Sequence, residues 1–458
     1  MSDIREFDVI VLGAGPAGEV CAGRLAQNGR AVALVEQELV GGECSFYACM
    51  PSKGLLRPAQ ALAEVRRVSG AAEAATGTLD VAAVLARRDE IIHNRDDSAQ
   101  MPWLEERGIA LVRGHGTLAG EREVRVGERL LRARKAVILA PGTRAAIPSI
   151  PGLAEAEPWT NREVTTSEAI PGSLIVLGGG VVGVEMAQAY ASLGARVTVV
   201  EAMGRLIASE EEFASDQVRE GLEGLGVEVV LGVKATSVTR AGGAGPVSIE
   251  LEDGRSFSGD EILAAVGRQP NTDSLGVESL GIEPGKSIAV DDTMRVPGHE
   301  WLYVVGDANG RVLLTHMGKY QARLAADHIL GRPVSLRSDG KLSPRVIFTE
   351  PQVAAVGHTL TSAREAGLYV RAADVPVGAV AGASFIGHGA PGTARVIVDE
   401  ERGVLVGATF TGVDVAEWLH AATIAVVCEV PLELLAHAVP SFPTRSEVWL
   451  RLLEELGL

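Results

Sequence analysis

The first strongly patterned stretch of the chain is an apolar run at residues 7–12, FDVIVL, which leads directly into three glycines. An apolar run of this length bounded by glycine is typical of a buried strand that ends in a tight turn. Small and apolar positions at helical spacing follow, and a second apolar run at residues 31–36 ends at an acidic residue. The pattern therefore predicts a strand, a turn, a helix and a second strand.

The glycines of this unit match the pattern GxGxxG, and each has a physical role. Gly13 makes the turn, Gly15 lets the backbone approach a pyrophosphate, and Gly18 lets the helix and strand pack closely. The helix N-terminus offers N–H groups to the phosphates, and Glu36 is placed to accept hydrogen bonds from ribose hydroxyls. Because glycine-rich turns are common in α/β proteins, one such match is a weak signal.

The same order of elements recurs at residues 173–201, with Gly178, Gly180 and Gly183 at the same spacing. The terminal acid, Glu201, lies 23 positions after the first glycine, as in the first unit. These two glycine turns could be structural and bind no ligand. A repeat with identical spacing instead favours two dinucleotide-binding sites. A carboxylate at Glu201 would repel a 2′-phosphate, which favours NAD(H) over NADP(H), although Arg205 softens this preference.

Composition narrows the class of protein. The chain has 458 residues, of which 47% are hydrophobic, and this suffices for several domains. The net charge of −17 comes without a long acidic run, so it predicts a solvated surface and argues against a nucleic-acid partner. No stretch approaches the roughly 18 apolar residues of a membrane helix. Because the N-terminus does not resemble a secretion signal, we expect a reducing cytoplasm.

Two of the four cysteines, Cys44 and Cys49, lie in GGECSFYACMPSK, residues 41–53. Residues five apart in a regular helix are displaced by about 7.5 Å, more than the roughly 7 Å limit for a disulfide. A bond between them would therefore need a distorted helix start, and a strained disulfide is easier to reduce. A helix N-terminus here would lower the thiol pKa.

A zinc site would need two further ligands at suitable spacing, but Cys21 lies in the first helix and Cys428 in an apolar helical segment. Both are expected to be small core residues. A redox pair is therefore favoured over a metal site or two inert buried thiols.

Together these motifs resemble the FAD-dependent pyridine nucleotide-disulfide oxidoreductases, most closely the dihydrolipoamide dehydrogenase, glutathione reductase and mercuric reductase group. The family's redox motif is GGTCxNxGCxPSK. LAPGTR (139–144) and AAVGRQPNT (264–272) look like the strands returning beside each nucleotide. YVVGDANGRVLLTH (303–316) resembles the second FAD motif, and PRVIFTEPQVAAVG (344–357) resembles the start of the dimerisation domain.

The resemblance covers nearly the whole chain and implies an α/β fold. Two Rossmann-like dinucleotide-binding domains, for FAD and NAD, would be joined by an α+β C-terminal dimerisation domain. The expected boundaries are 1–150 for the first part of the FAD domain with the redox cysteines, 151–272 for the NAD(P) domain, 273–340 for the second FAD or central part, and 341–458 for the interface domain.

The resemblance also implies residue roles. Cys49 would be the charge-transfer thiol beside the flavin and Cys44 the interchange thiol that meets substrate. Lys53 and Glu185 would pair beside flavin N5, where the nicotinamide delivers hydride; an exposed lysine and a solvated helix face are the alternatives. The candidate FAD residues are Gly13, Gly15, Gly18, Glu36, Lys53, Gly116, Gly142, Asp307 (ribityl chain) and Thr315 (backbone facing the flavin); those for NAD are Gly178, Gly180, Gly183, Glu201 and Gly267; no metal is expected.

The C-terminal motif departs from the family pattern HPTxSE, in which the partner subunit's histidine is the acid-base group. Aligning PTRSE places Phe442 at the histidine position and keeps Glu447 as the acidic residue. General acid-base catalysis is typically worth about 10²–10⁴ in rate, so reduction of an ordinary disulfide should be slower. His437 is one possible substitute, and Tyr47 is another, but an unperturbed tyrosine with a pKa near about 10 is a slow acid at neutral pH.

The implied function is a homodimeric FAD enzyme that takes electrons from NADH and passes them through the Cys44–Cys49 pair to a disulfide. A quinone, another small acceptor or oxygen is the alternative that Phe442 supports. Phe46 and Tyr47 between the cysteines would narrow access, stack a flat substrate, or pack under the flavin. A flavin redox sensor without turnover is a further alternative. Mercury reduction is disfavoured because the C-terminal cysteine pair of those enzymes is absent after Cys428.

Overall fold

The computed structural model describes residues 4–243 and 245–458, which form two compact units. The first unit comprises Met1–Pro51, Asp89–Ala146 and Gly267–Gly340, and the second comprises Ser52–Arg88, Ile147–Val266 and Lys341–Leu458. Residues 52–88, which we expected in the first FAD segment, therefore pack with the NAD and interface segments.

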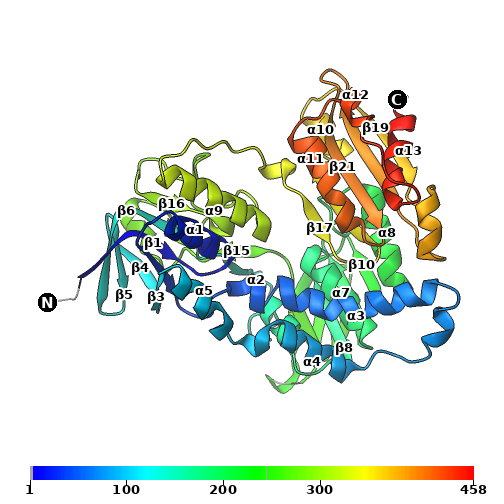
Figure 1. Cartoon of the computed structure of the whole chain (residues 1–458). Coiled ribbons are helices and arrows are strands. Elements are labelled where there is room, and N and C mark those ends of the chain that lie inside the picture. The colour runs from blue at the N-terminus through cyan, green and yellow to red at the C-terminus, as the bar shows by residue number, and fades with distance from the viewer. Residues whose placement is uncertain (1–3, 244) are drawn as a thin grey trace. The chain divides into compact units, whose positions relative to one another are not determined.

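The first unit is built on a sheet with the strand order β3-β2-β1-β6-β5-β4, and β16 pairs with β6. Strands β3, β2, β1, β6 and β16 pair in parallel, whereas β4 and β5 extend the sheet as an antiparallel hairpin. Helices α1 and α9 pack against each other in this unit (Figure 1). The strands are β1 (Ile4–Leu12), β2 (Val32–Glu36), β3 (Ala110–Arg113), β4 (Gly116–Gly120), β5 (Glu123–Val126), β6 (Arg129–Leu139) and β16 (Leu302–Val304), and the helices are α1 (Pro16–Gln27), α2 (Gly42–Phe46), α5 (Met101–Glu106) and α9 (Thr315–Ile329).

The second unit contains the repeat of this arrangement. Its parallel sheet has the order β10-β9-β8-β14, and a separate antiparallel sheet has the order β11-β12-β13. The strands are β8 (Ser173–Leu177), β9 (Arg196–Glu201), β10 (Glu228–Leu231), β11 (Ala235–Arg240), β12 (Val247–Leu251), β13 (Ser256–Gly259) and β14 (Glu261–Ala264), and the helices are α3 (Cys49–Arg67, which begins in the first unit), α4 (Val81–Ile91), α6 (Asn161–Thr166), α7 (Val181–Ser192) and α8 (Glu212–Gly224).

The C-terminal part of the second unit is a five-stranded antiparallel sheet of order β17-β18-β21-β20-β19, and α11 packs on β18 and β21. Phe410 is buried in its core and makes edge contacts with Trp418 and Trp449, with ring centroids 6.2 and 5.8 Å apart. The elements are β17 (Arg345–Ile347), β18 (Gln352–Gly357), β19 (Val370–Pro376), β20 (Thr393–Asp399), β21 (Val404–Gly412), α10 (Leu360–Glu365), α11 (Leu419–Val427), α12 (Leu432–Leu435) and α13 (Val448–Glu455). The predicted α/β class, with two strand–turn–helix–strand units and an α+β C-terminal part, is confirmed.

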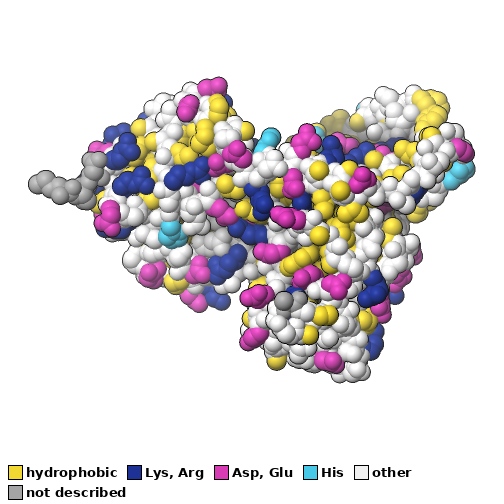
Figure 2. All heavy atoms as spheres, turned by 90° about the horizontal axis from the view of Figure 1, so that it is seen from below, with side chains coloured by type: hydrophobic (Ala, Val, Ile, Leu, Met, Phe, Trp, Pro, Cys, Tyr) yellow, Lys and Arg dark blue, Asp and Glu magenta, His cyan; other side chains and the backbone are white. Residues whose placement is uncertain are grey.

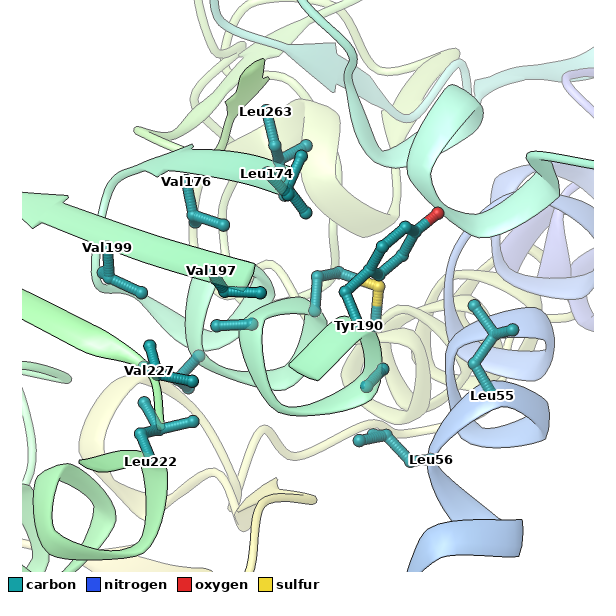
Figure 3. Packing of buried hydrophobic residues seen from close by; sticks show 14 of the residues in the cluster. Leu55, Leu56, Leu174, Val176, Tyr190, Val197, Val199, Leu222, Val227 and Leu263 are labelled. Carbon is teal, nitrogen blue, oxygen red and sulfur yellow. The ribbon is translucent and has the colours of Figure 1, made fainter. Parts of the chain in front are cut away.

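One hydrophobic cluster attaches α3 to the parallel sheet of the second unit. Figure 3 shows Tyr190 of α7 between Leu55 of α3 and the strand residues Leu174 and Leu263. The tyrosine is 1% exposed, and its hydroxyl donates to the Val164 carbonyl at 2.7 Å, so its polar end is satisfied within the core. The cluster thereby holds the helix that carries Lys53 against the helix that carries Glu185.

The charged side chains show no large field of one sign on the face drawn in Figure 2, where acidic and basic groups are interspersed. This agrees with a net charge of −17 that is spread along the chain. Among the described residues, no helix combines the length and apolar character needed to cross a membrane.

Candidate functional site

The first glycine turn has one open position between two crowded ones. Gly13 has φ of +99°, and a Cβ there would lie 2.2 Å from the Ala140 carbonyl oxygen. A Cβ on Gly18 would lie 1.9 Å from the Gly13 oxygen, whereas nothing lies within 4 Å of a Cβ on Gly15. The crowded positions require glycine for packing, and the open one leaves room for a ligand at the start of α1.

The second turn repeats this geometry. Gly178 has φ of +110°, and its Cβ would lie 2.5 Å from the Ala265 oxygen; a Cβ on Gly183 would lie 1.9 Å from the Gly178 oxygen, and Gly180 is open. Ala265 lies in AAVGRQPNT, as Ala140 lies in LAPGTR, so each of these segments passes beside a glycine turn. Neither helix has a side-chain cap at its N-terminus, which leaves backbone N–H groups for phosphate. Both turns fit a dinucleotide.

The two terminal acids shape these turns. Glu36 accepts hydrogen bonds from the N–H of Ala14 and of Glu38, both at 2.7 Å. Glu201 accepts hydrogen bonds from the Gly179 N–H at 2.5 Å and from the Met203 N–H at 2.6 Å. Burial raises the pKa of Glu36 above its usual value, although both amide bonds oppose the shift. Carboxylate oxygens have further lone pairs, so a ribose hydroxyl can still bind.

The remaining candidate FAD residues have different surroundings. Gly142 has φ of +67° and nothing within 4 Å of a Cβ, which suits close approach of a ligand. Gly116 is a packing position, because its Cβ would lie 3.0 Å from Val35 Cγ1. Gly267, the NAD candidate, has φ of +144° and is open. Asp307 accepts from Thr143 Oγ1 at 2.7 Å, so this part of the second FAD motif is linked to LAPGTR.

Arg268 is a charged residue of the first unit that sequence motifs did not identify as part of the site. Its Nε donates to Thr143 Oγ1 at 2.6 Å, and its guanidinium lies 3.9 Å from Glu43 and 4.0 Å from Asp307. The cation therefore stands between two carboxylates, and one of them, Glu43, occupies the threonine position of the family motif. The available signal was the arginine within AAVGRQPNT.

The two cysteines lie on different helices. Helix α2 ends at Phe46, Tyr47 leaves helical geometry with φ of −134°, and α3 begins at Cys49. The helix distortion that a Cys44–Cys49 bond would require is therefore present. Phe46 is 3% exposed and is a packing residue, whereas Tyr47 is half-buried.

Cys44 and Cys49 are not joined by a disulfide in the structure, and Cys44 hydrogen-bonds to Cys49. The pKa of Cys44 is raised, first because it hydrogen-bonds to Cys49 and second because it is buried. The expected lowering by a helix N-terminus is wrong for Cys44, since the neighbouring sulfur and burial outweigh it. Thr315 Oγ1, at the start of α9, lies 3.5 Å from Cys49 Sγ. The pair thus favours a state in which Cys44 keeps its proton.

The structure brings Lys53 and Glu185 together. Lys53 Nζ donates to Glu185 Oε2 at 2.7 Å, and the glutamate is only 3% exposed. The other carboxylate oxygen accepts from the Phe348 N–H at 2.9 Å. Glu185 is therefore a buried, fully engaged carboxylate and does not lie on a solvated helix face.

The C-terminal candidate residues differ in exposure. Phe442 is 76% exposed and His437 is exposed. Glu447 Oε2 is buried without a hydrogen-bond partner.

The two other cysteines differ in burial. Cys21 is buried as expected, but Cys428 is exposed, so its predicted core position is wrong: it follows the last residue of α11, beyond the buried face. Within the described residues, no group of three or more histidine, cysteine or acidic side chains could hold a metal ion.

Residues 7–322 match the family described as pyridine nucleotide-disulphide oxidoreductase, and residues 343–452 match the dimerisation domain of the same family. The chain belongs to this family. It is 31% identical to the dihydrolipoyl dehydrogenase of Haloferax volcanii, over 96% of this chain and 94% of that protein. It is 28% identical to a mercuric reductase of Staphylococcus aureus, over 96% of this chain and 81% of that protein.

Solved structures agree with this assignment. LpdA of Mycobacterium tuberculosis superposes with a TM-score of 0.86 and 26% identity, covering 99% of both chains. A Cu(II) complex of the HOCl-induced flavoprotein disulfide reductase RclA of Escherichia coli gives a TM-score of 0.83 and 25% identity, covering 98% of this chain and 99% of that chain. The chain is therefore an FAD-dependent NAD(P)H disulfide oxidoreductase. Its dimerisation domain supports a homodimer.

Proposed function

We propose that this enzyme passes electrons from NADH through FAD to the Cys44–Cys49 pair and on to a small disulfide of the dihydrolipoamide type. The observation that carries the proposal is the contact between Cys44 and Cys49 across a helix break, with Thr315 beside Cys49. The similarity to dihydrolipoyl dehydrogenases supports the disulfide class.

The chain's own residues then have distinct tasks. Bound FAD and nicotinamide would supply the two-electron reduction that opens the Cys44–Cys49 disulfide to two thiols. Cys44, as a thiolate, attacks one substrate sulfur, and the other substrate sulfur leaves as a thiolate that takes up a proton. Cys49 then attacks Cys44, which releases the second substrate thiol and restores the disulfide. The raised pKa of Cys44 makes its deprotonation the demanding step.

The pyridine nucleotide is proposed to be NADH. Glu201 places a carboxylate at the end of β9, where a 2′-phosphate would lie. Arg205 keeps its positive charge, but its two terminal nitrogens donate to the Ala208 and Glu210 carbonyls at 2.7 and 2.9 Å, which restrains the side chain. The guanidinium is thus bound to its own loop.

The four-segment organisation and the shared site are also proposals. Residues 1–150, 151–272, 273–340 and 341–458 would act as FAD, NAD, central and interface segments, with residues 52–88 packing with the NAD and interface segments. In the homodimer, Phe442 and Glu447 of one protomer would lie over its partner's disulfide, and the cytoplasm would keep the pair reducible.

A second acceptor class is favoured by Phe442. With an exposed phenylalanine at the family's histidine position and Glu447 Oε2 without a partner, proton delivery to a leaving thiolate lacks its usual group. A quinone, oxygen or a metal ion such as Cu(II) accepts electrons without a thiolate leaving group. RclA, which was solved as a Cu(II) complex, supports including copper among the acceptors.

The test is a comparison of acceptors with the purified holoprotein, using NADH or NADPH as donor. Lipoamide, a benzoquinone and Cu(II) are offered separately, and Cys44→Ser and Cys49→Ser variants are assayed beside wild type. The disulfide proposal expects NADH-dependent lipoamide reduction that both substitutions abolish. If both variants still reduce every acceptor at the wild-type rate, the cysteine pair has no role in turnover. A protein that purifies without flavin would refute the assignment of an FAD enzyme.

A further inference from the structure

Three groups surround the ammonium group of Lys53. It donates to Glu185 Oε2 at 2.7 Å and to Ser52 Oγ at 3.3 Å, and the ring centroid of Phe348 lies 4.7 Å from Nζ. An ammonium group has three donors and no acceptor, and a cation within about 6 Å of an aromatic centroid is attracted to the ring. Two hydrogen bonds and one ring therefore restrain a side chain that is otherwise flexible.

The backbone of Phe348 is held independently of its ring. Its N–H donates to Glu185 Oε1 at 2.9 Å, and its carbonyl accepts from Gln60 Nε2 at 3.0 Å. Two residues further on, the Glu350 N–H donates to Gln188 Oε1 at 2.6 Å. Removing the ring would therefore leave the course of the backbone in place.

The two oxygens of Glu185 consequently bind two different parts of the chain. One accepts from Lys53 on α3, and the other accepts from Phe348, directly after β17. The buried carboxylate is 3% exposed, so neither bond is shared with bulk water. Phe348 thus contacts both members of the pair, one through its ring and one through its amide.

We propose that Phe348 is a positioning residue for electron entry, whose ring sets the Lys53 ammonium group and whose N–H sets Glu185. The inference rests on the proposed function, in which this pair stands where hydride arrives. It assigns a task to the first residues after β17, at the start of the matched dimerisation domain.

The first test measures Lys53 directly in the full-length protein, with and without FAD. An amine-reactive reagent such as trinitrobenzenesulfonate is applied briefly, and modification at Lys53 is quantified by mass spectrometry. We expect Phe348→Leu to raise the labelling rate of Lys53 about two- to fivefold, because the attraction of the ring is lost. Phe348→Tyr keeps the ring face and is expected to match wild type.

A matched control removes the same kind of contact elsewhere in the second unit. The ring of Phe213 lies 5.0 Å from the Arg395 guanidinium, so Phe213→Leu deletes an equivalent cation–ring contact. It is expected to leave Lys53 labelling unchanged. Equal labelling in Phe348→Leu and wild type would overturn the proposal, and so would an increase in Phe213→Leu or Phe348→Tyr, because general loosening would then explain the result.

The second test separates electron entry from exchange in the holoprotein. Stopped-flow mixing with NADH should show slower flavin reduction in Phe348→Leu, whereas exchange between the reduced pair and lipoamide keeps its wild-type rate. Equal loss in both steps would contradict positioning of Lys53. A wild-type holoprotein that NADH fails to reduce would refute only the proposed function, since the labelling comparison needs no turnover.

Discussion

Removing Lys53 should destabilise the protein by leaving the buried carboxylate of Glu185 without its cation. Deleting one partner of a fully buried ion pair costs about 3–5 kcal/mol. Two features reduce this free-energy cost. The side chain of Lys53 is 35% exposed. Glu185 also keeps its hydrogen bond from the Phe348 N–H, and a hydrogen bond to a charged group is worth about 1.5–3 kcal/mol. We therefore expect Lys53→Met to lower the free energy of unfolding by about 2–3 kcal/mol.

The double variant Lys53→Met/Glu185→Met isolates the interaction. It removes both charges and replaces them with apolar side chains, so it should be more stable than the sum of the single losses predicts, by at least about 1 kcal/mol. Urea unfolding of the holoprotein, followed by tryptophan fluorescence and by flavin release, gives the four midpoints of the cycle. Single losses below about 1 kcal/mol, or strictly additive losses, would refute a stabilising pair.

Four other outcomes are expected from single substitutions and from chemical modification. Phe442→His should raise lipoamide reduction at least about tenfold and leave flavin reduction by NADH unchanged, which stopped-flow and steady-state assays measure together. In the NADH-reduced enzyme, alkylation of Cys44 by iodoacetamide should be slow at pH 7 and rise with pH, because its pKa is raised; Cys49→Ser removes the largest cause and should speed alkylation at pH 7. Arg205→Ala should change the KM ratio of NADPH to NADH less than about twofold, because its guanidinium binds its own loop. Glu19 lies in the first turn of α1, where burial raises its pKa to about 7. Its contribution to stability is therefore favourable below its unfolded pKa of 4.5 and is lost as pH rises through 7. Glu19→Gln should flatten the pH dependence of the urea midpoint over this window.

The glycine turns could be predicted because their constraints are local. At Gly18 and Gly183 a Cβ would lie 1.9 Å from a carbonyl oxygen, so only glycine fits there. Such glycines recur at the fixed spacing of the GxGxxG pattern, which is visible in the sequence. The partners of Glu185 could not be found in this way. Phe348 lies 163 residues away in sequence, and no local pattern announces which residue donates to a buried carboxylate. Cys428 illustrates the same limit, because an apolar helix does not reveal which of its ends faces solvent.

The departures from the family pattern are concentrated on one side of the reaction. The parts that admit electrons in the proposed function keep the expected arrangement: both glycine turns are intact, and Lys53 pairs with a buried Glu185. The altered residues are Phe442, Glu43 and those between the cysteines, and in the proposed function Phe442 and the residues between the cysteines lie where a substrate meets the pair. Because in the proposed function the two half-reactions share the cysteines, we expect replacement of the proton-delivering group to slow a disulfide acceptor and to leave electron entry intact. The acceptor is therefore the feature in which this enzyme is expected to differ from the dihydrolipoyl dehydrogenases it resembles.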